Sequence, residues 1–398
     1  MSEDLWIIGA SMTPFGKMPD RDVLDLATTA AFGALDDAGV TMRDVGVMAV
    51  GSQFEAITFG QQVQKQIGQT GIPLYNVHNA CATGATALRS VLMEIKAGEA
   101  DMGIAIGAEQ MTNPGTPPSF PRYNNETYTP KGRNEAVMMT EGVLGTGQMF
   151  GVFAEIGVDY ARKHDGVGLE QFAKVAQKNH AHAVLNPLAQ RRQEHSLEEI
   201  MNAEMLSYPN TLYMACPIGD GAAAVVVVSG EKLKTMDPDV RRRAVKLSAS
   251  VMTTDPYTPD TEALPDVNTL TRNAANKAYE IAGIGPDDLD LVELHDCFAT
   301  AELVHYDNLR LCEPGGAGAF IDSGAPWRDG TTPVNVSGGL LSKGHPIGAT
   351  GVANVYEVVT QLRGEAGDRQ LDDPRVGLTH VIGLGSACCV NILERSAT

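Results

Sequence analysis

The sequence predicts an α/β protein made of two similar halves, with a loop-rich segment inserted into the first half. Two observations support this prediction: a series of helices and apolar strands occurs twice in the same order, and a run rich in proline and glycine lies between the two occurrences. Strands that alternate with amphipathic helices are typical of layered α/β folds. We expect the first half to comprise residues 1–112 and 207–240, the insertion residues 113–206, and the second half residues 241–398.

The repeat begins with a helix that ends at a glycine and leads into an apolar strand. Residues 34–40 (ALDDAGV) precede a strand at 47–50, and residues 279–284 (YEIAGI) precede a strand at 289–294. Glycine ends helices because it adopts the left-handed backbone conformation at no steric cost. The two segments therefore indicate equivalent elements in the two halves.

Two further pairs of segments extend the repeat. A Gly-Ala-Thr sequence opens an apolar-periodic helix over residues 84–97 and again over residues 348–362. Short apolar runs at 104–107 and 381–383 then predict buried strands. Three pairs in the same order are difficult to attribute to chance, so we interpret them as a duplication.

The insertion combines a loop-rich part with two amphipathic helices. Prolines and glycines are frequent over residues 113–151, and apolar residues follow a helical period over 153–163 and 169–184. Insertions of this kind commonly form a lid or a substrate-binding subdomain. The first half resumes with the run 220–228, which predicts a strand buried on both faces.

Composition and charge exclude several classes of protein. Lys and Arg number 30 against 49 Asp and Glu, a net charge of −19 that gives no attraction for nucleic acid. The longest apolar run near the middle of the chain, 222–228, is far shorter than the about 20 residues that cross a bilayer, so we expect no membrane span. The acidic start (MSED) differs from a targeting peptide, and six cysteines without C-x-x-C spacing indicate reduced thiols. We therefore expect a cytoplasmic protein.

Cys81 and His345 each stand just before one of the two repeated helices. N–H groups at a helix N-terminus stabilise a thiolate, so we expect Cys81 to be a nucleophile with a lowered pKa. His345, which a proline follows, can deprotonate a thiol or hold an oxyanion. Taken alone, Cys81 is equally well an inert cysteine in a tight turn, and His345 a capping or core histidine. Their equivalent places in the repeat favour the catalytic interpretation.

His295 and Cys297 follow the predicted strand 289–294. Polar residues just past a buried strand are where α/β sheets bind ligands, and alternate residues of an extended chain point to one side. A pair of metal ligands is the alternative interpretation, but the spacings of zinc sites are absent and we expect no metal. His180 and His182 diverge by about 200° on a helix, so we interpret them as surface or packing residues.

Nucleotide chemistry has little support in this sequence. It contains neither a Walker phosphate-binding pattern nor a dinucleotide-binding fingerprint, which argues against a nucleotide-hydrolysing or NAD-dependent enzyme. The remaining cysteines are interpreted as small buried hydrophobic residues: Cys216, Cys312, Cys388 and Cys389.

Residues 79–84 (NACATG), 295–298 (HDCF) and 337–351 (SGGLLSKGHPIGATG) together resemble the thiolase superfamily, and most closely its sterol-carrier-protein type. Shorter matches extend the resemblance over essentially the whole chain, at 172–182, 216–224 and 362–367. The resemblance implies the duplicated thiolase fold, in which two βαβαβαββ halves form five αβαβα layers and an inserted loop domain covers the active site. It also implies a homodimer or tetramer. The lipid-carrier domain of some members is expected to be absent.

The resemblance also implies roles for three residues. Cys81 accepts the acyl group, and His345 activates Cys81 and helps to bind the thioester oxygen. His295 stands where many thiolases carry Asn, and it positions that oxyanion site. Coenzyme A thioesters are the implied substrates, and no permanently bound cofactor is expected.

One departure from the usual thiolase pattern concerns the second catalytic cysteine. Most thiolases carry it on a late Cys-x-Gly loop, but the matching residue here is Val381. In the sterol-carrier type the cysteine of the His-Asp-Cys-Phe motif takes over as acid and base, which implies this role for Cys297. Gly383 is implied to pair its N–H with that of Cys81 as a second oxyanion hole.

Coenzyme A is polyanionic, so a chain of charge −19 must bind it through local groups. Ser248 resembles a pantetheine-contacting serine of thiolases, Gly339 lies in a turn that supplies N–H groups, and Lys178 is a candidate cation in the insertion. Each basic candidate is equally well part of a solvated helical face. The other basic candidates are Lys163, Lys174, Arg191 and Arg192.

The leading hypothesis is an acyl-CoA C-acyltransferase of fatty acid or sterol metabolism. It cleaves a 3-ketoacyl-CoA with coenzyme A, or runs the reverse Claisen condensation, through an acyl group on Cys81. The alternatives are a C-acetyltransferase or side-chain retro-aldolase that needs a small OB-fold-type partner subunit, and a non-catalytic thiolase-like scaffold. The presence of both Cys81 and Cys297 argues for a thiolase. Acyl chain length depends on loop residues such as Phe120, Tyr123, Met149 and Phe150.

Overall fold

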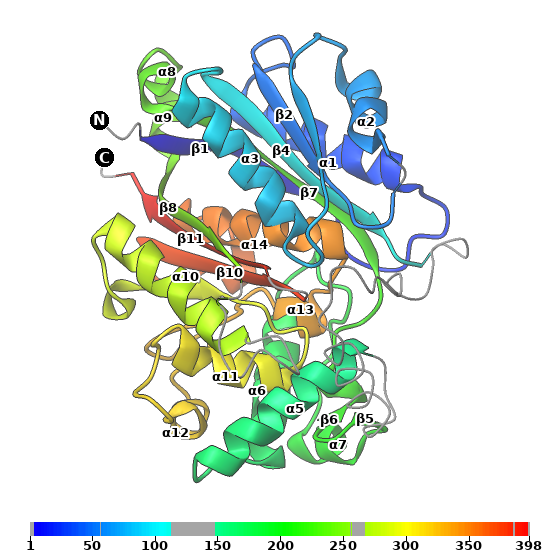
Figure 1. Ribbon diagram of the computed structural model, residues 1–398, viewed down its shortest axis with the longest axis vertical. Coiled ribbons are helices and arrows are strands. Elements are labelled where there is room, and N and C mark those ends of the chain that lie inside the picture. The colour runs from blue at the N-terminus through cyan, green and yellow to red at the C-terminus, as the bar shows by residue number, and fades with distance from the viewer. Residues whose placement is uncertain are drawn as a thin grey trace.

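A computed structural model of the protein describes residues 4–55, 57–112, 148–254, 256, 267–384 and 387–396. The first half has the predicted βαβαβαββ order, with the insertion before its last strand (Figure 1). Its elements are β1 (Leu5–Met12), α1 (Val23–Ala38), β2 (Val47–Gly51), α2 (Phe59–Ile67), β3 (Leu74–Val77), α3 (Thr83–Ala97), β4 (Met102–Gln110) and β7 (Asp220–Ser229).

The second half follows the same plan with one strand shortened. Its elements are β8 (Val245–Thr253), α10 (Val267–Ala282), β9 (Leu291–Glu293), α11 (Ala299–Asn308), α12 (Ala317–Asp322), α13 (Gly339–Ser342), α14 (Ile347–Leu362), β10 (Val376–Gly383) and β11 (Ala387–Arg395). The counterpart of β3 is reduced to a single parallel bridge between Val292 and Val334. The described part of the second half therefore has four strands where the first half has five.

The insertion contains both predicted helices. α6 (Leu169–Val184) has the predicted bounds, and α5 (Gln148–Lys163) begins five residues earlier than expected. The insertion also contains α7 (Leu197–Asn202), β5 (Met205–Ser207) and β6 (Asn210–Thr211), and two short helices, α8 (Gly230–Lys234) and α9 (Pro238–Arg243), lead into the second half. α5 and α6 pack against α11, so the insertion lies beside the second half (Figure 1). The proline-rich run 113–147 lies outside the described residues.

Glycine ends the two repeated helices as the sequence predicts. Gly39 follows α1 with φ of +66°, and Gly283 follows α10 with φ of +72°. The N–H of Gly39 donates to carbonyls of the last turn of α1. Since only glycine adopts this conformation without strain, both helices stop at the same point of the repeat and turn toward the next strand.

The described strands form one nine-stranded sheet and a separate two-stranded sheet, β5-β6. The order in the large sheet is β3-β2-β4-β7-β1-β8-β11-β10-β9. Among the described strands, those of the two halves meet only at β1 and β8, where Trp6 pairs with Lys246 and Ile7 with Val245. This short junction joins two sheets that otherwise belong to separate halves.

The halves stack as five α-β-α-β-α layers, as the resemblance implies. α1 covers the outer face of the first sheet and α10 that of the second, while α3 and α14 pack between the two sheets (Figure 1). The strand β7 has helices on both of its faces. Val225 and Val227 belong to the hydrophobic cluster around α3 and α14, and Val226 and Val228 belong to the hydrophobic cluster around α1. A strand covered on both faces is apolar throughout, which the sequence predicted.

No helix among the described segments is long and apolar enough to cross a membrane.

Candidate active site

The N-termini of α3 and α14 lie in contact at the centre of the molecule because glycines line the crossing. A Cβ on Gly84 would lie 2.6 Å from the carbonyl oxygen of Gly348, and a Cβ on Gly351 would lie 2.8 Å from the Cβ of Ala85. Both distances are shorter than ordinary contact between heavy atoms. Since Cys81 and His345 directly precede these two helices, the crossing brings their side chains together.

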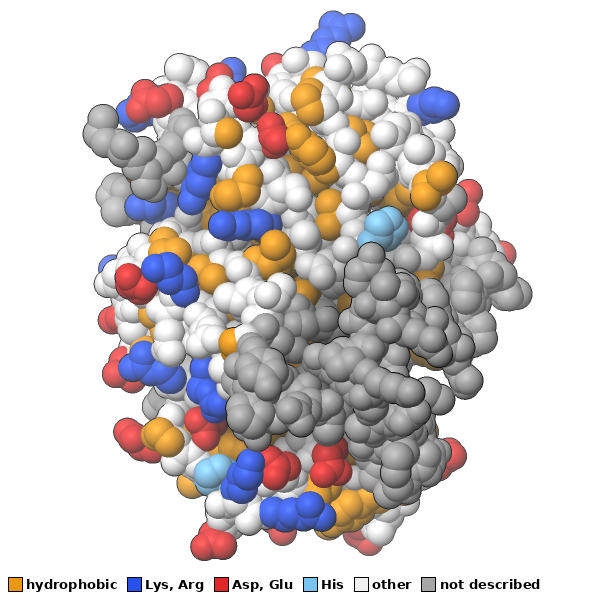
Figure 2. All heavy atoms as spheres, viewed as in Figure 1, with side chains coloured by type: hydrophobic (Ala, Val, Ile, Leu, Met, Phe, Trp, Pro, Cys, Tyr) orange, Lys and Arg blue, Asp and Glu red, His pale blue; other side chains and the backbone are white. Residues whose placement is uncertain are grey.

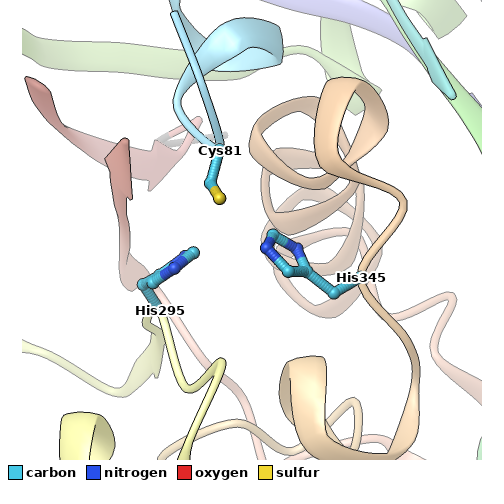
Figure 3. Close-up of side chains that lie close together, drawn as sticks. All are labelled: Cys81, His295 and His345. Atoms are coloured by element: carbon cyan, nitrogen blue, oxygen red, sulfur yellow. The ribbon is translucent and has the colours of Figure 1, made fainter. Parts of the chain in front are cut away.

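Cys81, His295 and His345 converge on one point (Figure 3). The thiol sulfur and one ring nitrogen of each histidine all lie within 4.8 Å of one another. The two rings meet edge to face, with 5.2 Å between their centroids. All three side chains are buried, and they come from three segments far apart in the sequence. The structure thus joins three of the five predicted catalytic residues in one group.

The tautomer of His345 follows from its hydrogen bonds. Nδ1 of His345 lies 2.7 Å from the hydroxyl oxygen of Thr350, and this hydroxyl donates its proton to the carbonyl of Pro346 at 2.9 Å. With its one proton engaged, the hydroxyl accepts a hydrogen bond from Nδ1–H. Nε2 therefore carries the free lone pair, and it has no hydrogen-bond partner among residues that the structure describes. A base with this geometry is ready to take a proton.

The His295 ring is held by packing rather than by hydrogen bonds. Neither of its ring nitrogens has a hydrogen-bond partner within the described segments. Its backbone N–H donates to Nδ1 of His380 at 3.4 Å, and its ring lies 6.3 Å from that of Phe153. Burial lowers the pKa of His295 well below the usual value, so the ring is neutral. Two unpaired nitrogens in a buried site are donors and acceptors available to a ligand.

The predicted lowering of the Cys81 pKa is wrong for the protein without substrate. Burial raises the pKa of Cys81 to about 12, although hydrogen bonds from the N–H of Leu384 and from its own N–H lower it. Loss of hydration is the largest contribution and exceeds the effect of these N–H donors. Burial likewise lowers the pKa of His345 to about 3. The resting pair is a neutral thiol beside a neutral imidazole.

Cys297 lies near this group but is not one of its three members. Burial raises its pKa well above the usual value, and the charges of Cys216 and Cys81 raise it further. The backbone N–H of Cys216 donates to the backbone carbonyl of Cys297 at 3.0 Å. This hydrogen bond holds the two segments side by side, and both thiols are free. The interpretation of Cys216 as a small buried residue is confirmed only in part, because the residue is half-buried. An apolar wall backs Cys297, in which Phe298 packs against Phe150 and Phe153.

Asp296 anchors the segment that carries His295 and Cys297. Its carboxylate accepts hydrogen bonds from the N–H groups of Leu340 and Leu341, at 2.7 and 3.2 Å, and from the side-chain amide of Asn179 at 2.8 Å. The burial of this carboxyl and the charge of Glu302 raise its pKa. Sequence reasoning assigned no role to Asp296, although it stands between two predicted catalytic residues.

Gly339, whose contact with coenzyme A stays a prediction, packs directly against Asp296. Gly339 is buried, with φ of +58°, and a Cβ there would lie 2.7 Å from the carboxyl carbon of Asp296. The glycine lets the carboxylate reach the first N–H groups of α13. The absence of a side chain at Gly339 therefore allows the hydrogen bonds that fix Asp296 to α13.

The contacts of Lys178 and Ser248 with coenzyme A stay predictions, and both side chains already have partners inside the chain. Lys178 is fully buried and binds Glu302 at 2.9 Å and the carbonyl of Val334 at 2.7 Å, so its charge is used inside the protein. The hydroxyl of Ser248 donates to Glu394 of the neighbouring strand. Ser248 lies five residues along β8 from Thr253, about 16 Å from the end of the strand beside Cys388.

The remaining basic candidates have partners within the chain. Lys174 pairs with Glu170 and Asp322, each at 2.7 Å, and the guanidinium of Arg191 donates to the carbonyl of Ala215. On the face that Figure 2 shows, basic side chains are interspersed with acidic ones. Arg192 donates to the carbonyl of Val184 and Lys163 pairs with Asp159.

Gly383 ends β10 beside the loop that carries Cys81. A Cβ at this position would collide with the carbonyl oxygen of Asn79 and lie 3.2 Å from the nitrogen of Ala82. Glycine thus allows the strand end to approach the nucleophile, and its role in an oxyanion hole stays a prediction. The N–H that reaches the Cys81 sulfur belongs to the next residue, Leu384.

The two halves are also joined by the buried carboxylate of Glu109. It accepts hydrogen bonds from the hydroxyl of Ser52 at 2.9 Å, from the N–H of Gln53 at 2.8 Å and from the N–H of Gly348 at 3.1 Å. Burial raises its pKa to about 7, against the effect of these donors. Glu109 thereby fixes the start of α14 to the first half.

Of the two interpretations of His180 and His182, packing is confirmed, because both side chains are buried on α6. His180 contacts the hydroxyl of Ser342, and His182 contacts the carbonyl of Asn335. Of the predicted pocket residues, Phe120 and Tyr123 lie outside the described residues, and so does the side chain of Met149.

Comparison with known proteins identifies the family. The thiolase N-terminal domain matches residues 5–201, and the thiolase C-terminal domain-like family matches residues 258–395. Sterol carrier protein 2 of Oryctolagus cuniculus is 37% identical over 401 residues, which cover 98% of this chain and 72% of that protein. The acetyl-CoA acetyltransferase of Methanothermobacter thermautotrophicus is 36% identical over 409 residues, which cover 98% of this chain and 100% of that protein.

Among solved structures, the Ltp2-ChsH2(DUF35) aldolase superposes with a TM-score of 0.81 at 22% identity, over 99% of this chain and 98% of that chain. This likeness shows a shared fold. Together with the matches to both thiolase domains, it agrees with the duplicated five-layer architecture. The chain belongs to the thiolase family, and it is an acyltransferase.

Proposed function

We propose that this chain is an acyl-CoA C-acyltransferase that carries its acyl group on Cys81. The observation that supports the proposal most strongly is the group of Cys81, His295 and His345, whose sulfur and ring nitrogens lie within 4.8 Å of one another in a buried site. A nucleophile, a neutral base beside it and free donors for an oxyanion are what acyl transfer through a covalent intermediate requires.

In the cleavage direction the first step makes the acyl-enzyme. The Cys81 thiol gives its proton to Nε2 of His345, and the sulfur bonds to the 3-keto carbon of the substrate. The bond between carbons 2 and 3 then breaks, and the enolate of acetyl-CoA takes the proton of the Cys297 thiol. The high pKa of Cys297 suits this step, because the thiol is protonated at neutral pH and becomes a strong base once its proton has left.

The second step returns the enzyme to its starting state. The Cys297 thiolate takes the proton of the coenzyme A thiol, whose sulfur bonds to the acyl carbon as the bond to Cys81 breaks. The proton on His345 returns to the Cys81 sulfur, so every proton is accounted for. In this proposal His345 and His295 bind the thioester oxygen, and the N–H groups of Gly383 and Cys81 bind the oxyanion of the acyl-enzyme.

The test is the mass of the protein after incubation with acetyl-CoA. Wild type is expected to gain one acetyl group, which peptide mapping assigns to Cys81, and Cys81→Ala is expected to gain none. Cys216→Ala is the matched control, because Cys216 is a cysteine near the site with no assigned role. An unmodified wild-type mass, or an adduct that persists in Cys81→Ala, contradicts the proposal.

Substrate and assembly are part of the same proposal. The substrate is a coenzyme A thioester, no cofactor stays bound, and the enzyme works as a homodimer or tetramer in a reducing, cytoplasmic compartment. Six free cysteines in the described residues support the reducing compartment. Cleavage rates for acetoacetyl-CoA against longer and branched 3-ketoacyl-CoAs would give the chain length, and sedimentation would give the assembly. The likeness to an aldolase solved with a DUF35 component supports testing a small partner subunit.

A further inference from the structure

We propose that the group of Cys81, His295 and His345 is also a binding site for Zn²⁺, with the thiolate and one nitrogen of each imidazole as ligands. These are the residue types that zinc selects in proteins. The three ligand atoms lie within 4.8 Å of one another, and all three residues are buried (Figure 3). The zinc spacings that the sequence lacks are local ones, whereas the fold gathers these ligands from three distant segments.

Each imidazole presents an unshared lone pair to the centre of the group. Nε2 of His345 has no hydrogen-bond partner among the described residues, and Nδ1 keeps its proton against the hydroxyl of Thr350. A ligand histidine whose second nitrogen donates to a protein oxygen is the usual arrangement in metal sites. Both ring nitrogens of His295 are without partners in the part of the chain that the structure describes, so either one is available.

The spacing suits a tetrahedral ion after a small movement. Zinc binds nitrogen at about 2.0 Å and sulfur at about 2.3 Å, which places neighbouring ligand atoms about 3.3–3.7 Å apart. From an upper limit of 4.8 Å, the closure needed is on the order of 1 Å, which side-chain rotation supplies. Three protein ligands leave the fourth position for water, as in zinc sites that stay open to exogenous ligands.

Charge favours a cation at this place. The net charge of −19 repels an anionic substrate at long range but attracts a divalent cation. Closer to the site, the charge of Glu109 acts on Cys81 and opposes a second negative charge there. A bound cation removes that opposition by pairing with the thiolate, and its binding releases the thiol proton.

The consequence for activity rests on the proposed function: an ion that holds the Cys81 sulfur and the His345 lone pair removes both nucleophile and base. The site is then inhibitory, and Zn²⁺ competes with acyl transfer rather than assisting it. Inhibition by Zn²⁺ is expected to be reversed by a chelator.

The test uses Co²⁺ as a spectroscopic probe for Zn²⁺ in the purified full chain. Wild type is expected to bind one equivalent with a thiolate-to-cobalt absorption band, which one equivalent of Zn²⁺ abolishes. The band is expected to vanish in Cys81→Ala, and Thr350→Val is expected to weaken binding about 10- to 100-fold. Cys297→Ser and Cys216→Ala, thiols outside the group, are expected to keep the band. Absence of the band in wild type, or its survival in Cys81→Ala, overturns the proposal.

Failure of this inference and failure of the proposed function give different results. A protein that binds Co²⁺ through Cys81 but takes no acetyl group from acetyl-CoA has the metal site without the reaction. A protein that is acetylated but shows no cobalt band has the reaction without the metal site. Where both hold, acetylation of Cys81 before the titration is expected to prevent Co²⁺ binding, and unchanged binding after complete acetylation contradicts the shared ligand.

Discussion

The protonation state of His345 is controlled by one hydroxyl group on the helix that follows it. Thr350 donates to the carbonyl of Pro346 and therefore accepts from Nδ1–H of His345. This leaves Nε2 with the free lone pair, and Nε2 is the base in the proposed mechanism. The residue is a positioning residue, since it acts on the substrate only through the imidazole.

Thr350→Val is expected to lower kcat about 10- to 100-fold, with a smaller effect on KM. Without the hydroxyl, the proton is free to move to Nε2, and the imidazole then presents a donor where a base is needed. Proton transfer by a well-placed base contributes about 10²–10⁴ in rate, so a partial loss of the correct tautomer costs part of that range. Steady-state kinetics with a 3-ketoacyl-CoA would measure the effect.

Two variants separate positioning from folding. Thr350→Ser keeps the hydroxyl and is expected to retain most of the activity. Thr360→Val removes an equivalent bond on the same helix, from the hydroxyl to the carbonyl of Tyr356, far from His345. It is expected to leave kcat within about twofold, because it removes no group that touches the site. Equal losses in Thr350→Val and Thr360→Val would contradict the assignment.

At the residue scale the sequence predicts which groups react but not which groups hold them. Cys81, His295 and His345 could be named because thiols and imidazoles before helices and after strands point to chemistry. The amphipathic pattern predicts that Lys178 is a surface cation, and only the tertiary structure places Glu302 beside it. Asp296 acts through hydrogen bonds to segments far away in the sequence, and Thr350 acts through hydrogen bonds to His345 and Pro346 at the start of α14. Residue type alone indicates neither role.

At the scale of elements, the crossing of α3 and α14 determines the distance between Cys81 and His345, the proposed nucleophile and base. Each helix begins just after one of the two residues, and glycines allow the helices to touch backbone to backbone. Gly351 of α14 packs against Ala85 of α3 in this crossing. A methyl group added there must push the helices apart.

Gly351→Ala is expected to lower kcat about 10²-fold and to destabilise the protein by about 1–3 kcal/mol. The new Cβ would lie 2.8 Å from that of Ala85, so about 1 Å of separation is needed to restore ordinary contact. A misplacement of 1 Å at reacting groups costs about 10²-fold in rate. Kinetics and urea unfolding would measure the two effects.

The control is Gly364→Ala, at the end of the same helix. Gly364 has φ of +75° and no atom within 4 Å of a built Cβ, so alanine there adds backbone strain without a collision. It is expected to cost about 1 kcal/mol of stability and to leave kcat unchanged. If Gly351→Ala behaves like Gly364→Ala, the crossing does not set the geometry of the site.

The repeat predicts most of these elements because its signals are local in the sequence. These signals are the glycines that end helices and the periodic spacing of apolar residues. Its registration alone places Cys81 opposite His345, and the two residues do lie together. The shortened strand at Val334 is not predicted, because one bridge needs no recognisable apolar run. The depth of the helix crossing is also not predicted, since it depends on which faces of α3 and α14 meet.

For the whole molecule, the duplication and the apolar strands predict the layers, whereas charge arguments predict the site poorly. The negative net charge implies that coenzyme A binds through local cations. However, the predicted Lys178 is buried in an ion pair, and the other described candidates bind carboxylates or backbone carbonyls of the chain.

Burial also affects the whole molecule through the pKa values of its histidines. Six of the nine are buried with lowered pKa values: His180, His182, His295, His305, His345 and His380.

These histidines make the folded protein sensitive to mild acid. Burial lowers the pKa of His180 to about 4 and those of His182, His305 and His345 to about 3, and it lowers the pKa values of His295 and His380 well below the usual value. Since histidine titrates at about pH 6.5 in an unfolded chain, the stabilising contribution of these residues is present above pH 6.5 and is lost as the pH falls below it. Three buried carboxyl groups act in the opposite direction, because burial raises their pKa values and the folded state keeps their protons: Glu109, Glu293 and Asp296. Six histidines outweigh three carboxyl groups.

Unfolding at pH 5.5 is therefore expected to take up about two to three protons per chain, and stability is expected to fall by about 3–4 kcal/mol for each pH unit below 6. Mixing the metal-free protein with concentrated urea in weakly buffered solution, with acid added to hold the pH, measures the uptake directly. His305→Leu is expected to reduce it by about one proton, because the His305 ring is buried against His380 and has a pKa of about 3. Release of protons, or no change in wild type, would mean that the buried carboxyl groups and not the histidines dominate the response to acid.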